Sequence, residues 1–169
     1  MNGKAHALAS ILAAVPTALL SGAALGPEVG LGALMGCVAG VFITPDVDQI
    51  DQVVIHHGER KLIKWLPGIG YAWLALWDPY ARVCPHRHAL SHLPVLGTVG
   101  RAAYIRLWLR IFNVQEWPLP PELTGGLFIG LFVSDLLHWI MDGGPIYVGK
   151  DVRIRCLRFL SASASGSRA

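Results

Sequence analysis

The fold is decided by residues 7–43, which read ALASILAAVPTALLSGAALGPEVGLGALMGCVAGVFI. The part from Ala7 to Leu25 holds no charged side chain and is about as long as a helix that crosses a hydrocarbon core of roughly 30 Å. Residues 26–28, Gly-Pro-Glu, then make a tight break, and a second apolar segment runs from Val29 to Ile43. The pattern predicts a helical hairpin.

The second segment of this hairpin has glycine at every fourth position, as Gly32, Gly36 and Gly40. Small residues at this spacing let another helix approach closely. Val29–Ile43 is 15 residues long, which is short for a membrane span, so a buried hairpin of a soluble helical protein is the alternative. The start of the chain also fits a secretory signal, but the short gap before the second segment favours the hairpin.

Two further apolar segments, Leu93–Phe112 and Leu123–Ile140, complete a set of four main helices. Ionisable side chains inside such segments are costly in lipid unless they face the bundle interior or water. Both segments could therefore be interfacial or partly submerged. The side chains concerned are Arg101, Arg106 and Arg110 in the first segment and Asp135 and His138 in the second.

Three stretches lie outside these helices. Residues 65–80 are rich in Trp, Tyr and Leu but contain Pro67 and two glycines, which predicts a short helix or loop in a membrane interface. Residues 146–160 could form a strand or a short amphipathic helix. Residues 161–169 are a low-complexity Ser/Ala tail that we expect to be disordered, so residues 1–160 should form a single helical membrane domain.

The composition favours a bilayer as the solvent of this chain. Hydrophobic residues make up 53% and charged residues only 15% of 169 residues, and the mean hydropathy is +0.48. Charged residues are near a quarter of an ordinary soluble domain. The three cysteines show no paired spacing, which excludes a CxxC redox motif and a local thiolate zinc cluster.

Seven histidine and aspartate residues fall at the edges of the four apolar segments, each at the end that an up-and-down arrangement brings to one side. Imidazole and carboxylate are ligands that borderline divalent cations, zinc above all, accept. We therefore predict an all-α, membrane-embedded, up-and-down bundle of about four main helices with a polar metal site at one end. The residues at these edges are His6, Asp46, Asp48, His86, His92, His138 and Asp142.

Two short motifs give local support to the metal site. His138 and Asp142 are four residues apart, which puts both on one face of a helix. The alternative is a helix-end histidine that hydrogen-bonds the aspartate. Asp46 and Asp48 follow Pro45 in a turn, where their carboxylates could chelate one ion or bridge two. Asp51 could accept a hydrogen bond in the outer shell of such a site. The alternative is that these aspartates lie in a turn exposed to solvent.

The stretch from His86 to His92 concentrates three imidazoles in seven residues. Arg87 lies among them, and its planar fork suits a phosphate or a carboxylate. This clustering favours metal or phosphate chemistry. The pair at residues 56–57 lies in a basic run and is expected on the rim of the site, and Cys84 is a solitary thiol nearby.

Charge placement predicts an orientation. The loops on the side of the proposed site are basic, and the opposite loops hold only Glu28, Glu116 and Glu122. By the positive-inside rule, the metal site faces the cytoplasm from the inner membrane, with the basic rim near anionic lipid head groups. Nucleic acid is not an expected partner, because the net charge is only +3 and no nucleic-acid module is visible. The basic residues are Lys4, Arg60, Lys61, Lys64, Arg82, Arg87, Lys150, Arg153, Arg155, Arg158 and Arg168.

Three stretches carry a resemblance to a known family: residues 3–6 (GKAH), residues 44–48 (TPDVD) and residues 85–98 (PHRHALSHLPVLGT). Together they resemble a bacterial and archaeal family of uncharacterised, predicted metal-binding membrane proteins. That family is similar to the inner-membrane metal-dependent hydrolases regulated by the LexA repressor. It is more distantly similar to zinc-dependent phospholipase C and the single-strand nucleases of the same helical fold.

This resemblance implies a set of site residues, with two departures from the family pattern. The family commonly has Lys-Thr-His-Asp where this chain has Lys4-Ala5-His6-Ala7, so an acidic neighbour of His6 is absent. His88 stands where a small serine is more usual. The implied ligands are His6, Asp46, Asp48, His92, His138 and Asp142, with His86 and Arg87 beside them.

The function expected from these observations is that of a membrane-embedded metal-dependent hydrolase acting on a phosphoester such as a lipid head group. Arg87 would clamp the substrate, and Asp51 could serve as a base. The reaction class comes from analogy, which a fold alone does not establish. The alternatives are a non-enzymatic membrane protein that stores, senses or transfers a cation, and a structural membrane protein whose histidines are incidental.

Overall fold

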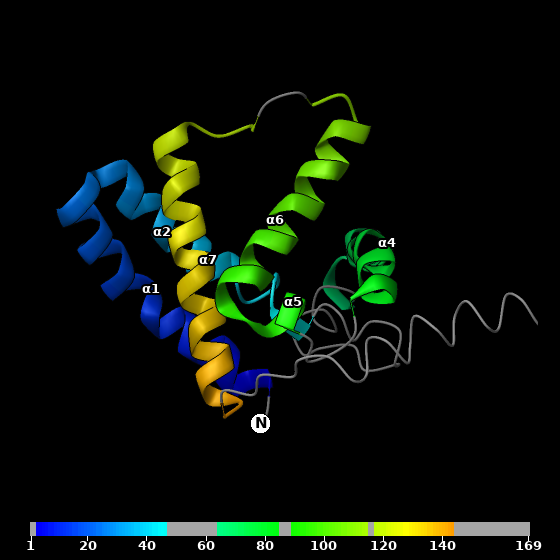
Figure 1. Cartoon of the computed structure of the whole chain (residues 1–169), viewed down its shortest axis with the longest axis horizontal. Coiled ribbons are helices and arrows are strands. Elements are labelled where there is room, and N and C mark those ends of the chain that lie inside the picture. The colour runs from blue at the N-terminus through cyan, green and yellow to red at the C-terminus, as the bar shows by residue number, and fades with distance from the viewer. Residues whose placement is uncertain (1–2, 47–63, 85–88, 115–116, 144–169) are drawn as a thin grey trace, which may run out of the picture.

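The computed structural model describes residues 3–46, 64–84, 89–114 and 117–143, and every regular element in these ranges is a helix (Figure 1). The predicted all-α fold is therefore confirmed. Residues 146–160 and the tail at 161–169 lie outside the described residues. The main helices are α1 (Gly3–Leu25), α2 (Pro27–Ala39), α6 (Pro94–Ile111) and α7 (Pro121–Met141), and two others are α4 (Pro67–Val83) and α5 (Ala89–His92).

Proline marks the start of four of these helices. Proline has no backbone N–H to donate and its φ angle already suits a helix, so it is favoured in the first turn, where an N–H has no intrahelical partner. The observed starts of α2, α6 and α7 consequently lie within two residues of the predicted ones. The four residues are Pro27, Pro67, Pro94 and Pro121.

Helices α2 and α7 lie side by side and pack through glycine on both (Figure 1). A Cβ atom placed on Gly36 would lie 2.9 Å from the Cα of Gly130, and one placed on Gly32 would lie 3.0 Å from the Cα of Gly126. Each would also overlap a backbone carbonyl of α7. The close approach predicted for the glycine repeat is therefore present, and the helix that approaches is α7.

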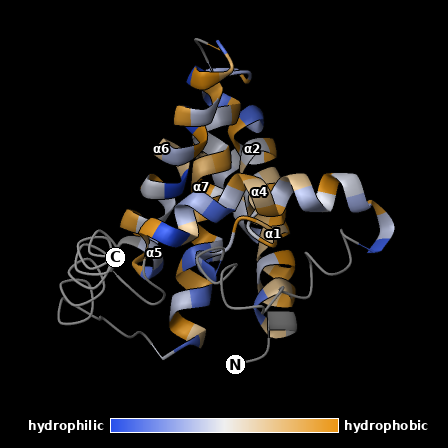
Figure 2. Cartoon of the chain, turned by 90° about the vertical axis from the view of Figure 1, so that its right-hand side faces the viewer, coloured by the Kyte–Doolittle hydropathy of each residue, from blue (hydrophilic) through white to orange (hydrophobic). Residues whose placement is uncertain are grey.

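For residues 65–80 the sequence predicted a short helix or loop; the structure has a helix there, but α4 is longer than predicted and continuous over 17 residues. Pro67 sits in its first turn, where it does not interrupt the helix. Trp77 is fully buried, and its ring centroid lies 5.6 Å from that of Tyr80 and 5.3 Å from that of Tyr104 on α6. This aromatic packing holds α4 across the direction of α7 (Figure 2).

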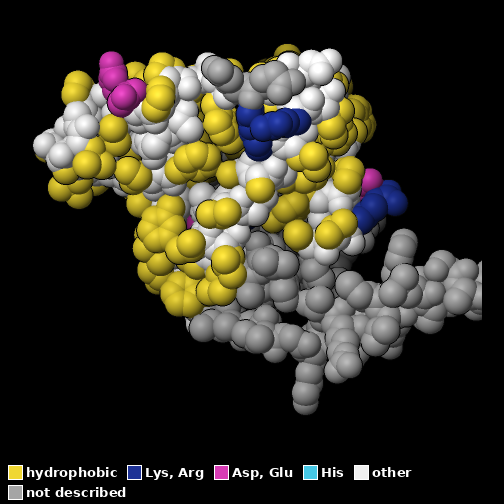
Figure 3. Space-filling view, turned by 45° about the horizontal axis from the view of Figure 1, so that its top comes forward, with side chains coloured by type: hydrophobic (Ala, Val, Ile, Leu, Met, Phe, Trp, Pro, Cys, Tyr) yellow, Lys and Arg dark blue, Asp and Glu magenta, His cyan; other side chains and the backbone are white. Residues whose placement is uncertain are grey.

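Two helices, α1 over Ala5–Leu25 and α7, are long and apolar enough to cross a membrane, judged by length and composition. Much of α1 faces outward, and hydrophobic side chains cover a large part of the face shown in Figure 3. Helix α2 is apolar but shorter. Exposed apolar side chains on α1 include Leu8, Ile11, Leu12, Val15, Leu19 and Leu20.

Candidate metal centre

Five side chains from four parts of the chain meet at one end of the bundle. His6 lies in the first turns of α1, and Asp46 follows the end of α2 directly after the buried Pro45. His92 is the last residue of α5. His138 lies in the last turn of α7, and Asp142 caps that helix. The up-and-down course of the main helices brings these positions together (Figure 1).

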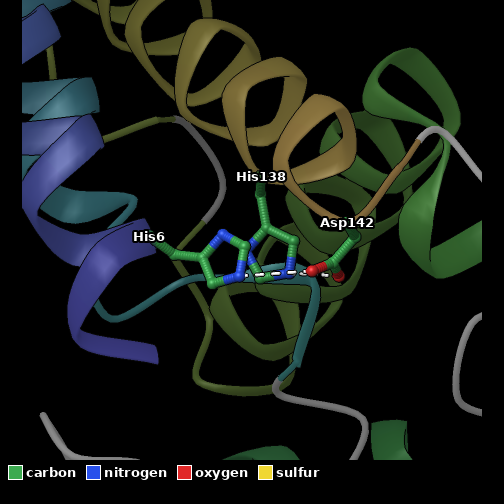
Figure 4. A group of neighbouring side chains, drawn as sticks. All are labelled: His6, His138 and Asp142. Carbon is green, nitrogen blue, oxygen red and sulfur yellow. Dashed lines mark ion pairs between the residues drawn. The ribbon is translucent and has the colours of Figure 1, made fainter. Parts of the chain in front are cut away.

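Asp142 lies beside two of the imidazoles and contacts both. Its Oδ1 atom is 3.2 Å from Nε2 of His6, and its Oδ2 atom is 3.4 Å from Nε2 of His138. The rings of His6 and His138 are stacked with centroids 4.0 Å apart, so both Nε2 atoms point toward the same carboxylate (Figure 4). These three residues form one group of possible metal ligands.

Asp46 has the same relation to a second pair of imidazoles. Its Oδ1 atom is 3.6 Å from Nε2 of His92, and its Oδ2 atom is 3.5 Å from Nε2 of His138. The rings of His92 and His138 meet edge to face at 5.9 Å. His138 therefore belongs to both groups of possible ligands, and its Nε2 atom is the centre of the arrangement.

The spacing of these atoms suits a metal ion. Zinc binds nitrogen and oxygen at about 2.0–2.2 Å, which puts neighbouring ligand atoms of a tetrahedral site roughly 3.3–3.6 Å apart. The four separations in the centre run from 3.2 to 3.6 Å. His138 Nε2 is buried and lies at ion-pair distance from the carboxylates of both Asp46 and Asp142.

Burial and charge also fit a cation. His92 is 2% exposed and His138 is 4% exposed, so both imidazoles lie beside the carboxylates in a setting with little solvent. The two carboxylates of Asp46 and Asp142 carry two negative charges, which match one divalent ion bound by neutral imidazoles. The donor set thus has the chemistry and the charge that a divalent metal requires.

A network of polar side chains lies behind the centre. Ser91 Oγ is 2.9 Å from Nδ1 of His92. Arg101 on α6 donates hydrogen bonds to the carboxylate of Asp135 on α7 and, at 3.1 Å, to the carbonyl of Ser91. Thr98 also donates to Asp135. From the sequence, Arg101 and Asp135 were recognised as costly in an apolar setting, but their pairing was not predicted. The signal that could have predicted it is that two apolar helices each carry a buried charge of opposite sign.

Four residues predicted for the site cannot be placed in this geometry. Asp48 and His86 were expected as ligands, Arg87 as the substrate clamp and Asp51 as a base. All four lie outside the described residues, as does His88.

Comparison with known proteins adds a family to this geometry. A family described as uncharacterized metal-binding protein (DUF2227) matches the chain over residues 2–151. Neither a curated protein nor a solved structure matches the chain. The matched range covers all five converging side chains.

Proposed function

The chain belongs to this family of metal-binding proteins, and we propose that it is a metal-dependent hydrolase that acts on a phosphoester. The observation that carries the proposal is the convergence of three Nε2 atoms and two carboxylates at the separations of metal ligands. Zinc is the first choice of metal, since imidazole and carboxylate are its common ligands in hydrolytic sites. The proposed ligands are His6, Asp46, His92, His138 and Asp142, with Asp48 and His86 as additional donors.

The chain's own residues would divide the work of hydrolysis. A divalent cation supplies acidity to a water molecule, lowering its pKa to about 7, and offsets charge on the phosphoryl oxygens. Arg87 would hold the anionic substrate through two parallel hydrogen bonds, and Asp51 would accept a proton from the water. The imidazoles of His6, His92 and His138 are all buried, which would limit competition between bulk water and these nitrogens for the metal.

The competing function is storage, sensing or transfer of a cation, for which the same ligands would serve. The two functions differ in their need for a fixed cation beside the metal. A carrier gains nothing from Arg87, since like charges repel, whereas a phosphoesterase needs it to stabilise an anionic transition state. A variant that lacks the Arg87 side chain can therefore distinguish the two functions.

We expect Arg87→Ala to retain its bound metal and to lose at least about 100-fold in phosphodiester turnover. The measurement is product release from bis-p-nitrophenyl phosphate and from phospholipid, with metal content determined on the same samples. The matched control is Arg82→Ala, which removes an exposed arginine that pairs with Asp78 at 2.8 Å. That control should keep both properties.

Two results would favour the storage or transfer function. One is the absence of turnover by the zinc-loaded protein on every phosphoester tried. The other is tighter metal binding by Arg87→Ala than by the wild type, because removal of a repelling charge would then be the main effect.

We also propose that the protein is embedded in the inner membrane with the metal centre toward the cytoplasm, in contact with membrane lipids. The supporting observation is the outward apolar face of α1, on which Leu12, Leu19 and Leu20 are all exposed. Burial of such side chains in hydrocarbon is favourable by about 1.5–3 kcal/mol each. The excess of Lys and Arg that the sequence predicts for the loops on this side supports the orientation.

We expect a cysteine at position 28, in the exposed first turn of α2, to react with a membrane-impermeant thiol reagent on intact cells. A cysteine at position 60 should react only after the cells are permeabilised. These variants, Glu28→Cys and Arg60→Cys, are made in a background without the native cysteines. The reverse pattern would contradict the orientation, and recovery of the protein in the soluble fraction would contradict the membrane location.

A further inference from the structure

Arg101 is a buried arginine that joins three helices behind the metal centre. Its side chain is 2% exposed, and that of Asp135, with which it pairs, is 1% exposed. One guanidinium nitrogen donates to Asp135 on α7, and another donates to the carbonyl of Ser91 on α5. The guanidinium of Arg101 thus contacts groups inside the protein, and these groups lie on α5 and α7, the helices that carry the proposed ligands His92 and His138.

The residues held by Arg101 are close neighbours of ligands. Asp135 precedes His138 by three positions on α7, so the two lie on the same face of that helix. Ser91 directly precedes His92, and its hydroxyl lies 2.9 Å from Nδ1 of the imidazole. When Nδ1–H donates to this hydroxyl, the lone pair of Nε2 is available to the pocket.

Gly97 provides the space in which these contacts form. A Cβ atom there would lie 2.5 Å from the carbonyl oxygen of Ser91 and 3.2 Å from the guanidinium nitrogen Nη1 of Arg101. Any larger residue would push α5 away from α6 at this point. The absence of a side chain at Gly97 therefore allows the contact between Arg101 and Ser91.

We propose that Arg101 is a positioning residue of the metal centre, which holds α5 against α7 so that His92 presents Nε2 beside His138. This inference rests on the proposed binding of metal at that centre. Arginine is suited to the task because its rigid fork can bond a carboxylate and a carbonyl in fixed directions, which the flexible amine of lysine does not reproduce. Groups that orient metal-binding histidines typically contribute about 10–100-fold to metal affinity.

The test uses Co²⁺ as the probe, because its visible absorption spectrum reports the number and type of ligands. We expect Arg101→Lys to lower Co²⁺ affinity by about tenfold or more and to move the spectrum toward that of His92→Ala. Ser91→Ala should do the same to a smaller extent, with partial recovery in Ser91→Thr, which keeps the hydroxyl. Arg110→Lys, an exposed change on the same helix, is the matched control and should leave both unchanged.

A second variant separates positioning from folding. The double change Arg101→Met with Asp135→Leu removes both buried charges, and such apolar replacements often keep or raise stability. We expect this variant to remain helical by circular dichroism and still to show the reduced affinity and the altered spectrum.

The outcomes are distinguishable. Wild-type affinity and spectrum in both Arg101→Lys and the folded double variant would overturn the positioning role and leave the proposed metal binding intact. A wild-type protein that binds neither Co²⁺ nor Zn²⁺ would overturn the proposed function and this inference with it.

Discussion

Replacing His138 by alanine is expected to remove metal from the protein more completely than any other single change. Its Nε2 atom lies 3.5 Å from Oδ2 of Asp46 and 3.4 Å from Oδ2 of Asp142. His138 is also the residue common to both groups of possible ligands. Since residues that merely orient a ligand contribute about 10–100-fold to metal affinity, loss of the shared ligand should exceed 100-fold. Phosphodiester turnover should fall with metal content.

The measurement is metal content of the purified protein together with titration by Zn²⁺ or Co²⁺. His92→Ala is a comparison variant for which a smaller loss of metal binding is expected. It leaves the group of His6, His138 and Asp142 in place and should keep measurable binding. Ile140→Ala, an exposed change two residues from His138, is the control for general damage to α7 and should bind normally. Normal metal content in His138→Ala would contradict the assignment of this site.

The largest expected effect on stability comes from Gly130→Ala. A Cβ atom at this position would lie 2.6 Å from the backbone nitrogen of Cys37 and 2.8 Å from the Cα of Gly36, and it would overlap the carbonyl of Ala33. Backbone atoms cannot rotate away as a side chain can, so α2 and α7 must separate. Overpacking of this kind costs about 1–3 kcal/mol, and more when the backbone is the obstacle.

Unfolding of Gly130→Ala followed by circular dichroism should show this loss. Gly125→Ala lies on the same helix with nothing within 4 Å of the added Cβ, so it should be neutral or stabilising by up to about 1 kcal/mol. Because α7 carries His138 and Asp142 while α2 leads to Asp46, Gly130→Ala should also weaken metal binding. Equal unfolding transitions in the two variants would contradict the role of the glycine contact.

The four main helices could be predicted from sequence because local signals mark their ends. Proline fixes the starts of α2, α6 and α7, and the apolar stretches fix their lengths. Among the described residues, local signals were misleading at residues 65–80, where Pro67 and the nearby glycines suggested interruption. There the burial of Trp77 against Tyr80 and Tyr104, a contact distant in sequence, favours a continuous helix.

The predicted ends of the helices also indicated which ionisable residues would lie near one another, but not which of them would form pairs. The sequence placed His6, Asp46 and His138 on one side of the bundle, and in the structure His138 shares one group of possible ligands with His6 and another with Asp46. The pairing of Arg101 with Asp135 could not be predicted in the same way, since it depends on how far α6 is rotated about its axis. The glycine repeat of α2 likewise predicted a close neighbour without identifying α7.

The spread of the ligands along the chain has a consequence for biosynthesis. His6 and Asp142 are 3.2 Å apart in space although 136 positions separate them in the sequence. A ribosome adds about 5–20 residues per second, so His6 leaves the tunnel on the order of ten seconds before Asp142 is made. A nascent chain that has not yet released α7 lacks two of the five donors, including the shared one. If these residues bind the metal, the full set of donors is assembled only after α7 has been released, and we expect chains truncated before α7 to bind the cation less tightly than the full chain.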